Sequence, residues 1–309
     1  MPSPEPCMSL ALTILPIALA IALGWAARAS GLIKADLWPG IEALSFKLLI
    51  PAILIHSIAT TDLSPSRIGG FAAGLLLTIL IGGLVVLVAG RLLRVPGPTR
   101  STYFQGTIRY NGFIGLAAAD LLIGPAGLSL IAVSMAVLIP VINVVTIIVM
   151  AVLCGGSTGP RRLLRSVATN PLVIGSCGGV AVNLLFGGLP VWLDEATQIV
   201  GRAALGVGLL AVGAGVSLKR MLHVSPRVVA ACALRPFMIT AIFLGLAMLL
   251  GLSETEMLGG ILVFAVPAAT NGFIVARMMG GDAATYADML AWQTLLCLIA
   301  IPFYAALVT

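Results

Sequence analysis

Charged residues are scarce in this chain: Asp, Glu, Lys and Arg make up 9% of its 309 residues. A typical soluble domain has about 25%. A water-soluble fold of this size could not cover its surface with so few charges, and 60% of the residues are hydrophobic. The expected solvent is therefore a lipid bilayer. The net charge of +6 does not indicate a nucleic-acid partner, because the basic residues do not gather with aromatic residues on one face.

Several functional motifs are also missing. The five cysteines are scattered without a C-x-x-C pair, so neither a metal site nor a redox site is indicated. The chain has no H-E-x-x-H or G-x-G-D motif of an intramembrane enzyme and no ATP-binding motif, so we expect no enzyme, no cofactor and no primary pump. The opening segment MPSPEPCMSL lacks a basic region and a cleavage site, and we expect a short exposed tail there rather than a removed signal peptide.

Long apolar stretches dominate the sequence. A membrane-spanning helix needs about 20 apolar residues, and charges, loops and Pro or Gly residues divide the chain into ten such stretches. The predicted spans are 9–29, 38–59, 68–91, 101–123, 127–153, 170–188, 195–218, 227–250, 256–279 and 285–307. The sequence thus predicts an all-α polytopic membrane protein. Five spans lie in residues 1–153 and five in 170–309, with a cytoplasmic linker at 154–169.

The basic residues predict the topology. Twelve of the 17 Lys and Arg residues fall in the loops on one side and one on the other, which makes the first side cytoplasmic. Both termini are then expected outside the cell membrane. Because each half has an odd number of spans, the two halves are expected to form an inverted repeat, an arrangement in which transporters place their substrate site at the midplane.

The string Asn-Gly-Phe-Ile occurs twice, at 111–114 in the fourth span and at 271–274 in the ninth. Asn, Gly and Pro weaken a helix, and unwound backbone survives in a membrane only beside a cavity or inside protein. We therefore expect spans 4 and 9 to be broken near mid-membrane, where helix ends can bind ions. The alternative is close helix packing through Gly, with Asn bonding to a neighbouring helix.

Several segments resemble the auxin efflux carrier family and its bacterial relatives. They are KLLIPAILIHSIA in span 2, RYNGFIGLAAADLLIGPAGL in span 4, NPLVIGSCGG with GRAAL in spans 6 and 7, and FAVPAATNGFIVARMMGGD in span 9. One departure is Ala117, which stands where the family has Pro, so that a break in span 4 has to rest on Gly112 and Gly115.

The resemblance implies a bile-acid-symporter or sodium/proton-antiporter-like fold. Spans 1, 2, 6 and 7 would form a scaffold, with a homodimer through it, and spans 3–5 and 8–10 a transport domain whose broken spans 4 and 9 cross at the substrate site. The implied function is secondary transport of small organic anions, such as auxin-like acids or dicarboxylates, by an elevator-type mechanism. A proton or sodium is a possible coupling ion. The alternative is a passive anion channel or facilitator.

The polar and helix-weak residues of the spans are the candidate site. The predicted substrate-binding residues are Arg109, Tyr110, Asn111, Gly112, Asn143, Pro267, Thr270, Asn271 and Gly272. The predicted ion- or proton-coupling residues are Asp120, Lys47 and Gln293. No metal ligands are predicted. Two interpretations of Arg109 stay open, an anion contact and a side chain that reaches the cytoplasmic surface or pairs with an acid. Asp120 fits a proton carrier or the outer end of a span, and Lys47 a coupling residue or a snorkelling side chain.

Overall fold

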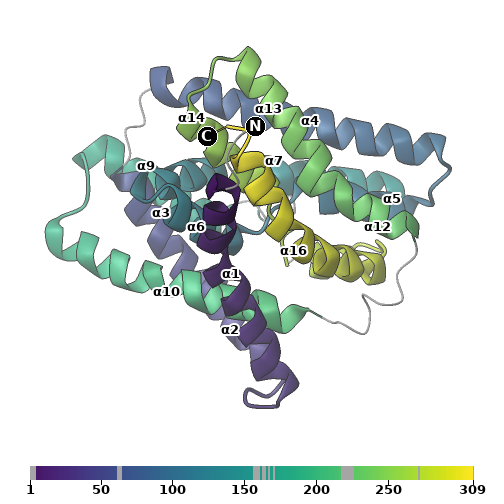
Figure 1. Cartoon of the computed structure of the whole chain (residues 1–309), viewed down its shortest axis with the longest axis horizontal. Helices are drawn as coiled ribbons and strands as arrows, with labels where there is room; N and C mark the ends of the chain where they lie inside the picture. Colours follow the sequence, from purple (N-terminus) through teal and green to yellow (C-terminus); the bar gives the residue numbers. More distant parts are fainter. Residues whose placement is uncertain are drawn as a thin grey trace.

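The computed structural model describes residues 5–60, 65–155, 171–216, 226–270 and 272–308, together with 161, 165, 168 and 169. Every regular element within these residues is a helix, which confirms the all-α fold class. Figure 1 shows the helices gathered into one body.

The helices of the first half of the chain include one continuous stretch with a π-helical segment, η1, in its middle. They are α1 (Glu5–Ala29), α2 (Trp38–Leu44), η1 (Ser45–Leu49), α3 (Ile50–Ala59), α4 (Pro65–Leu92), α5 (Gly97–Ile108), α6 (Gly112–Leu122) and α7 (Pro125–Cys154).

The second half also has a continuous helix with a π-helical segment, η2. Its helices are α9 (Pro171–Phe186), α10 (Val191–Gly215), α12 (Pro226–Ala233), η2 (Leu234–Ile239), α13 (Thr240–Leu249), α14 (Glu254–Phe264), α15 (Gly272–Met278) and α16 (Ala283–Ala305).

Local sequence signals account for several helix ends. Ser253 and Glu256 form a reciprocal capping box at the start of α14, which satisfies backbone N–H groups that the first turn leaves free. At its C-terminal end, α7 stops at Gly155. The φ of Gly155 is 74°, a left-handed conformation that glycine adopts without strain. Ser253, Glu256 and Gly155 thus determine where these two helices begin and end.

Six helices in the described part of the chain are long and apolar enough to cross a membrane. They are Trp38–Ala59, Gly69–Leu92, Pro125–Cys154, Val191–Gly215, Ala231–Leu249 and Ala283–Ala305. Leu15–Ala29 and Pro171–Phe186 are shorter apolar helices that fall in predicted spans 1 and 6. Predicted spans 4 and 9 each contain two helices rather than one. The number of ten spans and their inverted repeat stay predictions.

The helices pack in two groups. In the first group, α10 packs along α1 and against α3, and α3 packs against α9, while α2 and η1 adjoin α10. In the second group, α4 and α7 pack on α5, α6 packs on α7, α13 on α14, and α12 and α15 on α16. Figure 1 shows the first group on the left and lower side, with α4, α5, α12 and α16 of the second group on the right.

Glycines bring the helices of the first group into backbone contact. A Cβ atom added to Gly213 of α10 would overlap the carbonyl oxygen of Ile21 on α1, and one on Gly201 would lie 2.8 Å from Ile53 Cα on α3. A Cβ on Gly175 of α9 would similarly lie 2.8 Å from the Cα of Pro51. Small residues at such contacts are how helices approach closely in a membrane. We call this group the glycine-packed bundle and the second group the interrupted-helix bundle.

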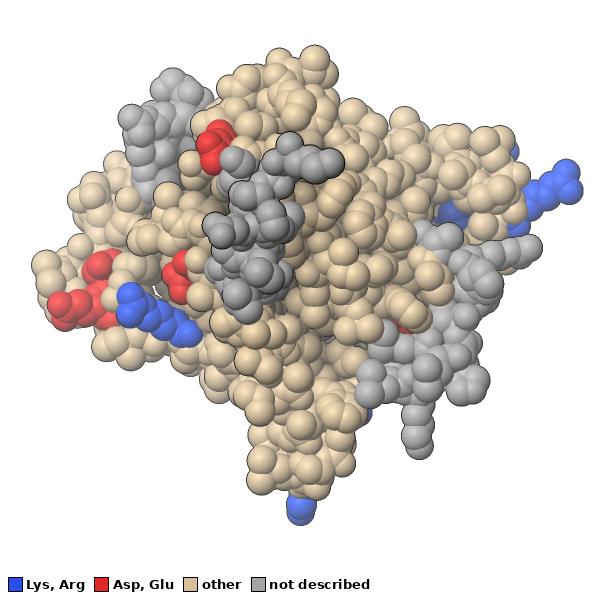
Figure 2. Space-filling model, viewed as in Figure 1, with Lys and Arg blue, Asp and Glu red and all other residues tan. Residues whose placement is uncertain are grey.

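The outer surface suits contact with lipid. Large apolar side chains are exposed on several helices, including Leu23 of α1 (63%), Leu84 of α4 (62%) and Leu249 of α13 (84%). In Figure 2 the charged side chains lie mainly toward the edges of the visible face, and most of the described surface between them is uncharged. An apolar surface of this kind is stable in a bilayer rather than in water.

Candidate functional site

The first helix interruption lies between α5 and α6. The backbone of Arg109 (φ −76°, ψ 149°) and of Asn111 (φ −85°, ψ 102°) is extended. The side-chain oxygen Oδ1 of Asn111 accepts hydrogen bonds from the backbone N–H groups of Phe113 (3.0 Å) and Ile114 (3.3 Å). Asn111 is therefore the N-cap that starts α6, a role for which Asn is a preferred residue.

The interruption lies just before the two glycines to which the sequence assigns it. Gly112 and Gly115, on which it was expected to rest, are both helical residues of α6, and so is Ala117. The interruption lies immediately before Gly112, at Arg109–Asn111, because the Asn111 side chain replaces the hydrogen bonds that a continuous helix would give to the first turn of α6.

The second interruption lies between α14, which ends at Phe264, and α15, which begins at Gly272. The backbone from Ala265 to Thr270 is not helical, and residues 265–268 are buried. Pro267 lies in this segment, where its missing N–H and fixed φ are tolerated more easily than in a helix. Asn271, one of the predicted binding residues, lies outside the described residues.

The two interruptions meet. The backbone N–H of Asn111 donates to the carbonyl oxygen of Pro267 at 2.8 Å, which joins the two non-helical segments directly. We call the two segments, Arg109–Asn111 and Ala265–Thr270, the junction. The junction lies within the interrupted-helix bundle, so its backbone is surrounded by protein, as unwound backbone must be in a membrane.

Arg235 of η2 holds the junction from one side. Its side chain is fully buried, and its guanidinium donates from Nη1 to Thr107 O (2.5 Å), from Nη2 to Val263 O (2.8 Å) and from Nε to Val266 O (2.6 Å). Thr107 is in the last turn of α5 and Val263 in the last turn of α14. The guanidinium thus satisfies carbonyl groups at the ends of both helices, which have no partner within their own helix.

Two side chains of α16 hold the junction from another side. The buried amide of Gln293 accepts from Ala268 N (3.0 Å) through Oε1 and donates to Gly106 O (3.1 Å) through Nε2. The hydroxyl of Tyr286 donates to the carbonyl of Ala269 at 2.6 Å. Side chains from two neighbouring helices therefore replace many of the hydrogen bonds that the interruptions remove.

A cavity of about 80 Å³ opens beside the junction, enough for several water molecules. Its polar wall comes from the interrupted-helix bundle: Arg109, Tyr110, Asn111, Asn143 and Thr270. The remaining lining is apolar apart from backbone. It comprises Phe46, Ile50 and Leu172 of the glycine-packed bundle, and Gly112, Phe113, Met135, Ile139, Ile142 and Ala269 of the interrupted-helix bundle. The cavity therefore lies where the two bundles face each other.

The polar wall is suited to an anion. Arg109 contributes a positively charged side chain that is 6% exposed, and no Asp or Glu is among the described residues that line the cavity. Asn111 Nδ2 and Tyr110 Oη are buried and have no hydrogen-bond partner among the described residues. Donor groups beside a buried cation, with no acid in the lining, favour a ligand that brings a negative charge and acceptor oxygens.

The structure brings together most of the predicted binding residues. Six of the nine line the cavity: Arg109, Tyr110, Asn111, Gly112, Asn143 and Thr270. Pro267 lies behind it and accepts from Asn111, while Gly272 packs against the ring and hydroxyl of Tyr286. That these residues bind a substrate stays a prediction.

The predicted coupling residues lie elsewhere. Lys47 on η1 and Asp120 on α6 are exposed and are not part of the cavity lining. Gln293 is buried, and both ends of its amide are bonded to the backbone at the junction. None of the three therefore faces the cavity, and their role in coupling stays untested.

Sequence reasoning missed two parts of the site. Arg235 is an ionisable residue in an apolar span, which is a signal of function, but the sequence alone does not distinguish a buried side chain from one that reaches the surface. The apolar wall of Phe46, Ile50 and Leu172 had no signal, because these residues resemble the other apolar residues of their spans.

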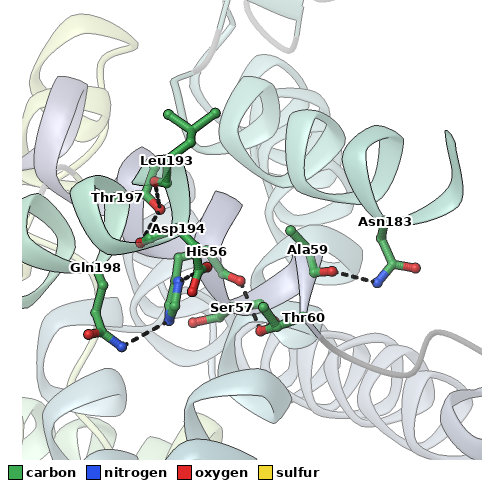
Figure 3. Close-up of polar contacts among 9 residues, drawn as sticks. All are labelled: His56, Ser57, Ala59, Thr60, Asn183, Leu193, Asp194, Thr197 and Gln198. Atoms are coloured by element: carbon green, nitrogen blue, oxygen red, sulfur yellow. Dashed lines mark hydrogen bonds and ion pairs between the residues drawn. The ribbon is translucent and has the colours of Figure 1, made fainter. Parts of the chain in front are cut away.

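A separate polar cluster joins the helices of the glycine-packed bundle, as Figure 3 shows. His56 Nδ1 of α3 lies 2.7 Å from Asp194 Oδ1 of α10, and Gln198 Nε2 is 3.5 Å from the other ring nitrogen. Asn183 of α9 donates to the carbonyls of Ile58 and Ala59 at the end of α3. None of these residues lines the cavity. In the described part of the chain, no three His, Cys, Asp or Glu side chains gather as a metal site.

Comparison with known proteins adds one match. Residues 160–305, just under half of the chain, match the family model described as a membrane transport protein. This range contains Arg235, the second interruption and Gln293, but not Arg109 or Asn111. No curated protein matches the chain.

Proposed function

We propose that this chain, which belongs through its second half to the membrane transport protein family of the auxin efflux carriers, is a secondary transporter of small organic anions. Membership in the family makes it a multi-pass membrane transporter. The proposal adds the substrate class, the location of the site and the way in which it opens to each side of the cell membrane.

One observation carries the proposal: residues of both helix interruptions line a single cavity between the two bundles. Arg109 and Asn111 come from the first interruption and Thr270 from the second. Helix ends that meet at the middle of a membrane protein, beside a polar cavity, are the arrangement that secondary transporters use for charged substrates. We accordingly take α5–α6 and α14–α15 as two interrupted spans of a ten-span inverted repeat with both termini outside.

The composition of the cavity narrows the substrate. Arg109 is the single charged side chain in the described lining, and a guanidinium matches one carboxylate in two-point contact. The opposite wall, with Phe46, Ile50 and Leu172, offers apolar contact. A small acid with one carboxylate and an apolar body, such as an auxin-like acid, fits this lining better than a dicarboxylate, whose second charge would face apolar residues.

The division of the lining between the bundles supports an elevator-type cycle. The polar groups belong to the interrupted-helix bundle, whereas the glycine-packed bundle contributes apolar side chains alone. A substrate held by the first could slide past the second without breaking polar contacts. The glycine-packed bundle would then be the stationary scaffold, and its exposed apolar residues, such as Phe186 (77%) and Trp192 (71%), offer a surface for the expected homodimer.

The test begins with the purified protein and a thermal-shift screen of aromatic and aliphatic mono- and dicarboxylates, across pH and in sodium or choline chloride. The acid that stabilises most is then used, radiolabelled, for counterflow in proteoliposomes. We expect saturable uptake that unlabelled acid on the inside accelerates. Arg109→Gln should lower affinity by about 10- to 100-fold, because a buried charge-assisted hydrogen bond is lost. Arg109→Lys should retain part of it.

Arg202 provides the matched control, since it lies on α10 and is exposed. Arg202→Gln should leave affinity and counterflow unchanged. Flux that does not saturate and shows no counterflow would identify a passive channel instead. Unchanged affinity in a folded Arg109→Gln protein would show that the site is elsewhere.

A further inference from the structure

The junction contains a concentration of negative backbone charge. The carbonyl ends of α5 and α14 both point into it, and each helix end carries the equivalent of about half a negative charge. Two such ends amount to roughly one negative charge in a place away from water. In secondary transporters, exposed carbonyls of unwound segments and helix C-termini are the groups that bind a coupling sodium ion.

In this chain a side chain occupies that place. The guanidinium of Arg235 contacts Thr107 O at the end of α5, Val263 O at the end of α14 and Val266 O in the second interruption. No acidic side chain among the described residues forms a salt bridge with Arg235. Its single positive charge is thus balanced by the carbonyl groups of the two helix ends, each of which carries about half a negative charge.

The position of Arg235 in the helix fits this role. It lies in η2, a π-helical segment, and π-helical turns are frequent at functional positions in helices. Arg235 does not line the cavity, which has its own cation in Arg109. The two arginines therefore have separate tasks, Arg109 facing the substrate cavity and Arg235 facing the backbone of the junction.

We propose that Arg235 is a built-in cation that takes the place of a coupling metal cation at the junction, so that the junction neither binds nor needs sodium. The role of Arg235 in place of a coupling cation rests on the proposed transport function. Cation binding itself can be measured without transport. Arg235 is a positioning residue in this scheme, because it acts on the helix ends that carry the site and does not touch the substrate.

The first measurement is the thermal unfolding of the purified full-length protein in NaCl, KCl and choline chloride at equal ionic strength. We expect the same Tm in the three salts for the unmodified chain. Arg235→Gln should unfold at a lower temperature in choline chloride and regain stability in NaCl, saturably and by about 3 °C or more, because sodium enters the vacated carbonyl site. Arg235→Lys, which keeps one cation, should have an intermediate Tm that does not depend on the salt.

Arg202→Gln, on the exposed side of α10, is the matched control and should behave as the unmodified chain in each salt. An Arg235→Gln protein that loses the same stability in all three salts would reduce Arg235 to a structural contact and overturn the proposal. If that variant does not fold, binding of radioactive sodium to the unmodified chain decides: saturable binding that Arg235→Lys leaves intact overturns the proposal, and its absence supports it. If the Arg235 variants show the expected Tm values but the protein shows no counterflow, the transport function is contradicted and the cation replacement is not.

Discussion

In the glycine-packed bundle, helices touch through their backbones, whereas in the interrupted-helix bundle the central contacts run from side chains to backbone. Gly213 lies directly against the carbonyl of Ile21, with no room for a single methyl group. At the junction, Arg235 and Gln293 reach across to carbonyl and N–H groups that no helix satisfies. The glycine contacts of the first bundle depend on shape, and the contacts at the junction depend on polar groups.

The two bundles differ in how their helices satisfy backbone polar groups. The helices of the glycine-packed bundle satisfy their N–H and C=O groups internally, and the bundle presents an apolar face toward the cavity. Interrupted helices expose polar backbone, which has to be satisfied by buried side chains and which also supplies the polar wall of the cavity. The polar wall of the cavity therefore comes from the bundle whose helices are interrupted.

The largest effect is expected from a change to the shape-based contact. Gly213→Val would force α1 and α10 apart, since the new side chain meets backbone and cannot be accommodated by a rotamer change. Overpacking typically costs about 1–3 kcal/mol and more when backbone is struck, and we expect little folded protein to be recovered in detergent.

Gly206 is the matched control for this change. It lies on the same helix, α10, and a Cβ there has no neighbour within 4 Å. Gly206→Val should alter the free energy of unfolding by no more than about 0.5 kcal/mol. Equal recovery of both variants by size-exclusion chromatography would show that backbone contact does not hold the glycine-packed bundle together.

Much of the fold could be predicted from the sequence, because a long apolar stretch identifies a membrane helix. The range 38–59 was predicted as a span, and Trp38–Ala59 is a continuous helix. Helix ends and interruptions were harder, since they depend on which polar side chain caps which turn. The sequence pointed to Gly112 and Gly115 by their low helix propensity, but the cap of Asn111 decides the position.

The candidate site divides in the same way. Arg109 and Asn111 could be predicted because polar residues are rare in apolar spans, and each such residue asks for an explanation. The partners of Arg235 could not, because Thr107 is 128 residues distant in the chain and offers only a backbone carbonyl. A contact to a backbone carbonyl does not depend on the residue type, so the sequence does not reveal it. An apolar wall is also not recognisable, because its residues resemble the rest of the span.

The second effect is expected at the junction. Gln293→Met would leave Ala268 N and Gly106 O without their side-chain partner in a buried place. An unsatisfied buried group costs about 1–3 kcal/mol, so a loss of roughly 2–3 kcal/mol in the free energy of unfolding is expected, measured by denaturant titration in mixed micelles.

Tyr286→Phe gives the graded comparison. It removes one donor from Ala269 O, which also accepts from the backbone N–H of Gly272. We expect a loss of about 1 kcal/mol. If Gln293→Met proved as mild as Tyr286→Phe, satisfaction of the junction by side chains would not be the feature that stabilises the interrupted-helix bundle.

A third, smaller effect separates stability from binding at Asn111. Asn111→Ala removes the cap of α6, which should cost about 1 kcal/mol. Asn111→Ser keeps a side-chain oxygen that can cap the helix but loses the amide Nδ2 of the cavity wall. The Ser variant should unfold near the normal temperature, yet both variants should bind the carboxylate found by thermal shift about fivefold more weakly. Normal affinity in the Ser variant would remove the Asn111 amide from the proposed site.

The smallest effect is expected for the hydrogen-bonded pair of His56 and Asp194, although Figure 3 shows it as the centre of a polar cluster. Their side chains are 17% and 32% exposed, so solvent and salt weaken the attraction. A double-mutant cycle with His56→Gln and Asp194→Asn should give a coupling energy of about 0.5 kcal/mol. A coupling above roughly 2 kcal/mol would mean that polar groups help to hold the glycine-packed bundle as they hold the junction. The contrast between the two bundles would then be one of degree, because both would depend on side-chain polarity.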